Sequence, residues 1–176
     1  MSTDSTARYG IPIDLANDGD SRARVLHLVR PARTVLELGA SVGLMTQVMH
    51  EWGVRVTTVE VDPAAQDLLS SVSERVVIGD LDSPDTLDQL GDAQFDLVLA
   101  SDVLEHLKDP LRCLTQAARH VAPDGRVILS IPNVAHGDIR LALLTGRFDY
   151  ADLGLLDRTH IRFFTRTSLA DLIAHA

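Results

Sequence analysis

The chain of 176 residues is poor in several residue types, and each shortage excludes a class of protein. Cys113 is the single cysteine, so neither an internal disulfide framework nor a CxxC metal site can form. Aromatic residues make up only 4%, so Val, Leu, Ile and Ala must form most of the core. Lysine is almost absent, and a net charge of −9 without a basic stripe argues against nucleic acid or an anionic membrane as the main partner.

No segment is long and apolar enough to span a bilayer, and the first residues lack the apolar stretch of a secretory signal. We therefore expect a cytoplasmic protein. Hydrophobic residues at 45% and charged residues at 23% are ordinary for a globular chain, and the length suits one domain with a real core.

Apolar runs that predict buried strands alternate with helical patterns. Strands are predicted at 35–38, 54–60, 76–79, 95–100 and 126–131, the last after a turn at 123–125, and helices at 21–30, 43–52, 136–145 and from 165 onward. Asp62, Ser83 and Asp109 each precede a proline and should cap a helix. This alternation predicts a doubly wound, Rossmann-like α/β sheet of about five mainly parallel strands in the order 3-2-1-4-5. A ligand should bind at the switch point, between the strands that begin at Val35 and Phe95.

The first predicted strand leads into a turn of small residues, Gly39-Ala40-Ser41-Val42-Gly43, which opens a helix. Small residues let the backbone approach a ligand, and the helix N-terminus faces the same place. The second strand ends in Glu60, about 20 residues beyond Gly39, where an acid can accept both hydroxyls of a ribose. The pattern therefore predicts a nucleoside site.

Two further strands end in acids at the same predicted edge, Asp80 and Asp102, and Glu37 lies in the first strand. Together with the turn and Glu60, these groups resemble the class I S-adenosylmethionine-dependent methyltransferases, and the resemblance extends from about Tyr9 to Leu172. Carboxylates suit this methyl donor, which offers a ribose diol, an amino group on adenine, an ammonium and a sulfonium. A dinucleotide would instead bring a pyrophosphate, which acids repel.

The resemblance implies a role for each residue and S-adenosylhomocysteine as product. It places Gly39, Ala40, Ser41 and Gly43 under the methionine and ribose, Glu37 near the methionine amine, Glu60 at the ribose, Val61 on adenine, Asp80 at the adenine amine with Leu81 beside it, and Ser101, Asp102, Val103 and His106 at the methionine end. It divides a single domain, 1–176, into an N-terminal cap (1–30), a cofactor-binding core (31–134), a substrate-side lid (135–165) and a last helix (166–176).

The runs 146–150 and 156–165 resemble more specifically the small-molecule methyltransferases of sugar, natural-product and ubiquinone-type pathways. We therefore expect methyl transfer to a small-molecule acceptor, at a hydroxyl oxygen. His160 lies in this segment and is the predicted general base, with a lid-packing histidine as the alternative. No clear ligand cluster stands out, so no metal site is predicted.

The sequence departs from the family pattern at two places. Ser41 replaces a glycine, which is tolerable if its φ stays negative. The C-terminal antiparallel hairpin of the family is apparently absent, which suggests a truncated chain or a minimal variant. An exposed sheet edge would then need a second copy or a neighbouring domain to cover it.

Two other functions fit parts of the sequence. A non-catalytic cofactor-binding domain of a larger enzyme would explain the absent hairpin. A short-chain dehydrogenase has a similar glycine turn, but it needs a tyrosine four positions before its lysine, and Leu104 stands there before Lys108, the only lysine.

Overall fold

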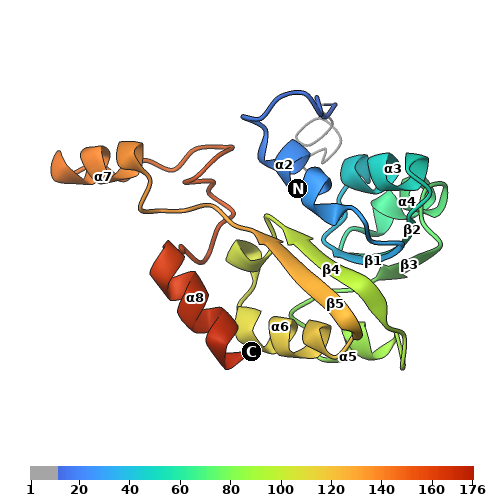
Figure 1. The fold of residues 1–176 in the computed structure, drawn as a ribbon. Helices are drawn as coiled ribbons and strands as arrows, with labels where there is room; N and C mark the ends of the chain where they lie inside the picture. Colours follow the sequence, from blue (N-terminus) through green and yellow to red (C-terminus); the bar gives the residue numbers. More distant parts are fainter. Residues whose placement is uncertain (1–11) are drawn as a thin grey trace.

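The computed structural model describes residues 12–176 and contains one sheet of five strands in the predicted order β3-β2-β1-β4-β5 (Figure 1). Every pair of neighbouring strands is parallel. Because β1 and β4 are neighbours, the switch point lies where the sequence predicts it. The strands are β1 Thr34–Leu38, β2 Arg55–Glu60, β3 Arg75–Ile78, β4 Phe95–Ser101 and β5 Val121–Ser130.

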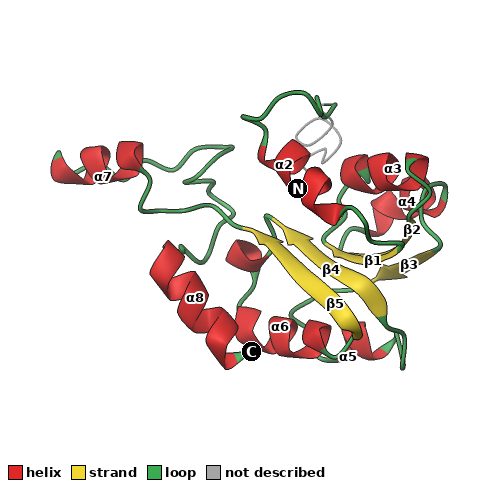
Figure 2. Cartoon of the chain, in the orientation of Figure 1, coloured by secondary structure: helices red, strands yellow, loops and turns green. Residues whose placement is uncertain are grey.

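Helices cover both faces of the sheet (Figure 2). Their bounds are α2 Ser21–Val29, α3 Leu44–Glu51, η1 Pro63–Ala65, α4 Gln66–Ser70, α5 Asp85–Asp88, η2 Leu104–His106, α6 Pro110–Ala118, α7 Gly137–Leu144 and α8 Arg166–His175. Successive residues of a strand point to opposite faces, so Val35 of β1 joins the cluster with α2 and α3, whereas Leu36 joins the cluster with α5 and α6. Burial on both faces explains why these strands are apolar throughout.

Two local predictions are wrong. The turn predicted at Pro123-Asp124-Gly125 lies inside β5, which begins at Val121. The ladder between β4 and β5 jumps from the pair Phe95–Val121 to the pair Leu97–Arg126, so the turn residues form an irregularity in a longer strand. Ser83 does not cap α5, whose N-cap position is Pro84 without a side-chain bond. The caps predicted at Asp62 and Asp109 are confirmed, and each accepts a backbone N–H of its helix.

The segment after β5 leaves the body of the domain and returns. α7 has no buried residue and projects away from the sheet (Figure 1). The chain comes back through an isolated bridge between Phe164 and Asn133, and α8 packs against α6. Thr165 caps α8 in a reciprocal pair with Ser168, as predicted for this position. β5 forms one edge of the sheet, and residues 12–176 show no antiparallel hairpin beside it.

Among the described helices, none has the length and apolar character needed to cross a membrane.

Candidate functional site

The turn after β1 approaches the end of β4 closely. Gly39 has φ 68°, and a Cβ there would lie 2.6 Å from Cγ2 of Val103, so only glycine fits. Gly43 is also left-handed and stands at the N-cap of α3. The condition of a negative φ at Ser41 is not met, since φ is 52°. Its N–H donates to Oε2 of Glu60 at 2.7 Å, and this bond offsets the cost of the left-handed backbone.

Glu60 is buried at the end of β2 and organises the loop around it. Besides Ser41, the N–H groups of Val61 and Asp62 donate to its Oε1, at 2.9 and 3.0 Å. A carboxylate offers about four acceptor positions, so three backbone donors leave capacity for a hydroxyl of a ligand. The acid is therefore fixed in direction before any ligand arrives.

Glu37 is buried beneath the loop, on the face of the sheet that α3 covers. Thr46 of α3 donates its hydroxyl to Oε2 of Glu37 at 2.6 Å. The pKa of Glu37 is raised to about 7, mainly by burial; the bond from Thr46 opposes this rise, and the charge of Glu60 contributes to it. A positive group that reached this carboxylate would lower its pKa again and be held strongly.

The residues predicted to hold the adenine end lie on the loops after β2 and β3. Val61 is 62% exposed and Leu81 is buried. Asp80 is exposed, and its Oδ1 accepts the N–H of Asp82 at 2.8 Å. An exposed apolar side chain and a fixed carboxylate at this rim suit a flat ring with an exocyclic amine.

At the end of β4, Asp102 has φ 55°, an uncommon backbone conformation outside glycine. Its N–H donates to the carbonyl of Ser130 in β5 at 2.8 Å, which holds this geometry. The side chain is exposed at the rim, yet the surrounding protein atoms raise its pKa by desolvation. The hydroxyl of Ser101 and the charge of His106 act in the opposite direction.

A further group of side chains gathers beside this end of β4. His106 and His160 meet edge to face with ring centroids 4.9 Å apart, and Nε2 of His160 lies 3.9 Å from Oε1 of Glu105. Glu105 is 1% exposed, and neither of its carboxyl oxygens has a hydrogen-bond partner among the described residues. Glu105 is not among the site residues predicted from the sequence, although an acid inside the apolar run 103–107 is a visible signal.

Glu105, His106 and His160 each offer one ligand atom, and these atoms lie within 4.8 Å of one another. The spacing alone would admit a cation or a shared proton. The pKa of Glu105 is raised to about 8, mainly by burial and to a smaller extent by the charges of Asp102 and Asp157, so its carboxyl is mostly protonated at neutral pH. A protonated carboxyl is a poor metal ligand. The absence of a metal therefore stays a prediction.

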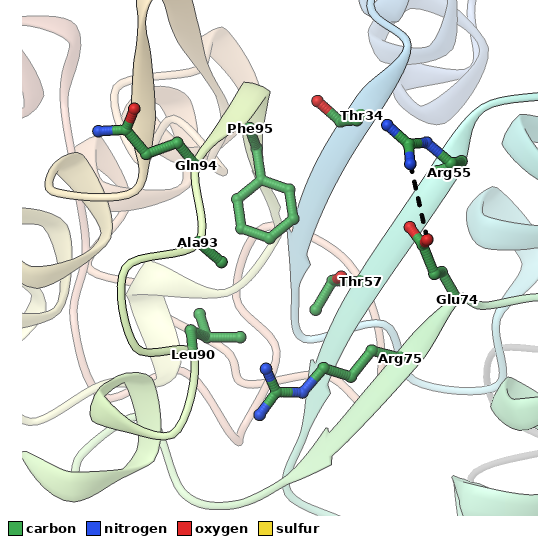
Figure 3. Close-up of a pocket in the computed structure, with 9 residues that line it drawn as sticks. All are labelled: Thr34, Arg55, Thr57, Glu74, Arg75, Leu90, Ala93, Gln94 and Phe95. Atoms are coloured by element: carbon green, nitrogen blue, oxygen red, sulfur yellow. Dashed lines mark ion pairs between the residues drawn. The ribbon is translucent and has the colours of Figure 1, made fainter.

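A groove in the described surface lies elsewhere, at the amino ends of the strands (Figure 3). This groove of about 460 Å³ includes Arg55, Glu74 and Arg75. Arg55 pairs with Glu74 at 3.7 Å, and Arg75 donates to the carbonyl of Gln89. Its charges already have partners within the protein, and it lies at the edge opposite the predicted switch point, so we assign it no ligand.

A parallel sheet in the order 3-2-1-4-5, with buried acids and a left-handed turn at its switch point, defines a Rossmann-like nucleoside-binding protein. The family model of the methyltransferase domain matches residues 15–176. The chain therefore belongs to this family, and its fold is that of the class I S-adenosylmethionine-dependent methyltransferases.

Curated relatives share about a quarter of their aligned residues with the chain. A ubiquinone biosynthesis O-methyltransferase from Pseudomonas paraeruginosa is 28% identical over 134 residues, which cover 66% of this chain and 57% of that protein. A protein of the same name from Xanthomonas campestris is 26% identical, covering 74% of this chain and 62% of the relative. The chain thus spans about three fifths of the length of these relatives.

Solved structures agree on the fold. A SAM-dependent methyltransferase from Archaeoglobus fulgidus superposes with a TM-score of 0.65 at 19% identity, covering 89% of this chain and 69% of that one. The CcbJ methyltransferase from Streptomyces caelestis has a TM-score of 0.55 at 25% identity, covering 70% of this chain and 57% of that one.

Proposed function

We propose that this chain transfers a methyl group from S-adenosylmethionine to a hydroxyl oxygen of a small-molecule acceptor. The observation that carries the proposal is the pair of buried acids, Glu37 and Glu60, around the left-handed turn at Gly39. The carboxylates at this edge suit a cationic nucleoside and disfavour a pyrophosphate. The O-methyltransferase names of the relatives support oxygen as the target.

In this proposal each side chain contacts a different part of the methyl donor. Glu60 accepts a ribose hydroxyl, Glu37 and Asp102 face the ammonium end, and Val61 and Asp80 contact adenine. When bound, the donor supplies a methyl carbon activated by a sulfonium. The work of the protein is to hold the acceptor oxygen in line with that carbon and to accept its proton. The base comes from the histidine pair His106 and His160, the second being the residue predicted from the sequence.

The test is turnover. Incubation of the chain with S-adenosylmethionine and a panel of phenols, catechols and sugars should yield S-adenosylhomocysteine and methylated product in equal amounts. Products carrying the methyl on nitrogen or carbon would contradict the choice of oxygen. Binding of S-adenosylhomocysteine without turnover on any acceptor would instead favour the second candidate, a cofactor-binding domain of a larger enzyme, which the partial coverage of the relatives motivates.

We also propose that a second copy or a neighbouring domain covers the outer edge of β5. The edge strand is ten residues long, and a long uncovered edge promotes association.

A further inference from the structure

A short junction, residues 107–109, joins η2 to α6. Peptide groups next to a helix end lack partners within the helix, so they must form hydrogen bonds elsewhere. In the junction these groups are the N–H groups of Lys108 and Asp109 and the carbonyl groups of Leu107 and Lys108. Their partners come from two segments that are distant in sequence from the junction and from each other.

One carboxylate holds both N–H groups of the junction. Oδ1 of Asp82 accepts the N–H of Lys108 at 3.0 Å and that of Asp109 at 3.1 Å, and Oδ2 also accepts the N–H of Lys108 at 3.0 Å. Asp82 lies on the loop after β3, where its own N–H donates to Oδ1 of Asp80, the residue proposed to contact adenine. Asp82 therefore connects the junction to the adenine end of the proposed donor site.

One guanidinium holds both carbonyl groups of the junction. Nε of Arg162 donates to the carbonyl of Leu107 at 3.4 Å, and its Nη2 donates to that of Lys108. Arg162 belongs to residues 159–162, which return from the lid and are called here the acceptor-side segment. Backbone bonds fix this segment to η2 as well, since Ile161 and Arg162 both donate to the carbonyl of Glu105, at 2.9 and 3.0 Å.

The charges of the two side chains match the groups that they bind. A carboxylate accepts from N–H groups and a guanidinium donates to carbonyl groups, and such charge-assisted hydrogen bonds are stronger than neutral ones. Both side chains bind Lys108, Asp82 at its N–H and Arg162 at its carbonyl. A displacement of this one residue would therefore disturb both sets of bonds together.

We infer that Asp82 and Arg162 are positioning residues that couple the adenine end of the donor site to the acceptor-side segment through the junction. The inference rests on the proposed function. A donor that contacts Asp80 favours the loop conformation in which Asp82 holds the junction. The held junction presents its carbonyl groups to Arg162, so donor binding stabilises the segment that contains His160. Because coupling is reciprocal, an acceptor bound against this segment strengthens donor binding.

Amide hydrogen exchange of the full chain, followed by NMR with and without saturating S-adenosylhomocysteine, measures this coupling without an acceptor. The reporters are the amides of Ile161 and Arg162. We expect the ligand to slow their exchange by about fivefold or more in wild type. The slowing should disappear in Asp82→Ala and in Arg162→Met, although both variants still bind the ligand. The double variant should lose no more than either single variant, because each change interrupts the same chain of bonds.

Asp96→Ala and Arg126→Met are matched controls near the amino ends of the strands. Oδ2 of Asp96 accepts two backbone N–H groups at 2.8 and 3.0 Å, and Nη2 of Arg126 donates to backbone carbonyl groups at the end of α2, at 2.7 and 2.9 Å. These side chains form the same kinds of bond without contacting the junction. Their variants should therefore keep the slowing of exchange.

Two features of the structure keep the test decisive. Arg112 and Gln116 of α6 also donate to carbonyl groups of the loop after β3, at 3.3 and 2.9 Å, so this loop stays in place when the Asp82 carboxyl is removed. Asp82→Asn retains an Oδ1 that can accept both N–H groups, so it should restore the slowing that Asp82→Ala loses. Arg162→Met changes an exposed side chain and decides the question alone if Asp82→Ala does not fold.

Two results would overturn the inference and leave the methyltransferase proposal intact. One is slowing in Asp82→Ala and Arg162→Met equal to that in wild type. The other is unchanged exchange of the two amides in a wild-type chain that binds S-adenosylhomocysteine. No binding by wild type would reject the proposed function, together with the inference that rests on it.

Discussion

Gly39→Ala should lose the cofactor site and part of the fold's stability together. The substitution forces an L-residue to φ 68° and places its Cβ 2.6 Å from Cγ2 of Val103. The backbone strain alone costs about 1–3 kcal/mol, and the clash adds to it or moves the turn away from β4. Denaturant unfolding measures the first effect, and titration with S-adenosylhomocysteine measures the second.

Gly53→Ala is the matched control, since Gly53 has φ 78° and nothing lies within 4 Å of a Cβ built there. It should cost only the backbone strain and leave cofactor affinity unchanged. The double variant Gly39→Ala/Val103→Ala should recover affinity, because it removes the methyl group that clashes. Equal losses of stability in the two alanine variants, with no recovery in the double variant, would show that the contact with Val103 does not constrain the turn.

Glu105→Gln should flatten the dependence of stability on pH. The pKa of Glu105 is about 8 in the folded chain and near 4.5 when unfolded, so the folded state holds the proton more tightly. The stability this provides is complete below pH 4.5, declines as pH rises, and is lost above pH 8. The change amounts to about 5 kcal/mol at most, and glutamine, which cannot ionise, lacks it.

The measurement is the free energy of unfolding of both proteins from acid to mildly alkaline pH. Glu37, whose pKa is about 7, gives a slope of the same sign in both, so the difference between the curves isolates Glu105. A difference in the free energy of unfolding between the two proteins that does not change with pH reflects only the burial of the glutamine amide. Glu51→Gln, an exposed change on α3, should run parallel to wild type. Parallel curves for Glu105→Gln and wild type would show that the carboxyl is not buried in solution.

The sheet could be predicted because the sequence signals for its strands and helices lie within short segments of the chain. Each strand is a short apolar run, since both of its faces are buried, and Asp62 and Asp109 mark helix starts by side-chain caps. The order of the strands then follows from the rule for doubly wound sheets. Pro123-Asp124-Gly125 was a misleading turn signal, because pairing with β4 on both sides keeps these residues within a strand.

The site was predictable in part. Acids at strand ends identify an edge, but the sequence does not show which carboxyl is buried or bonded. The left-handed conformation of Ser41 depends on Glu60, which is distant in sequence and accepts the backbone N–H of Ser41. Likewise, the environment of Glu105 arises from residues 155–162, which reach η2 only through tertiary contacts. Such long-range pairings leave no local pattern.

We propose that S-adenosylmethionine binds at the C-terminal edge of β1, β2 and β4 through Glu60. Calorimetric titration with S-adenosylhomocysteine tests it most directly, on wild type, Glu60→Ala and Glu74→Ala, the last at the opposite edge of the sheet (Figure 3). We expect one site in wild type, unchanged affinity in Glu74→Ala, and a loss of about tenfold or more, roughly 1.4 kcal/mol, in a folded Glu60→Ala. No binding by wild type, or equal affinity in Glu60→Ala, would contradict the claim.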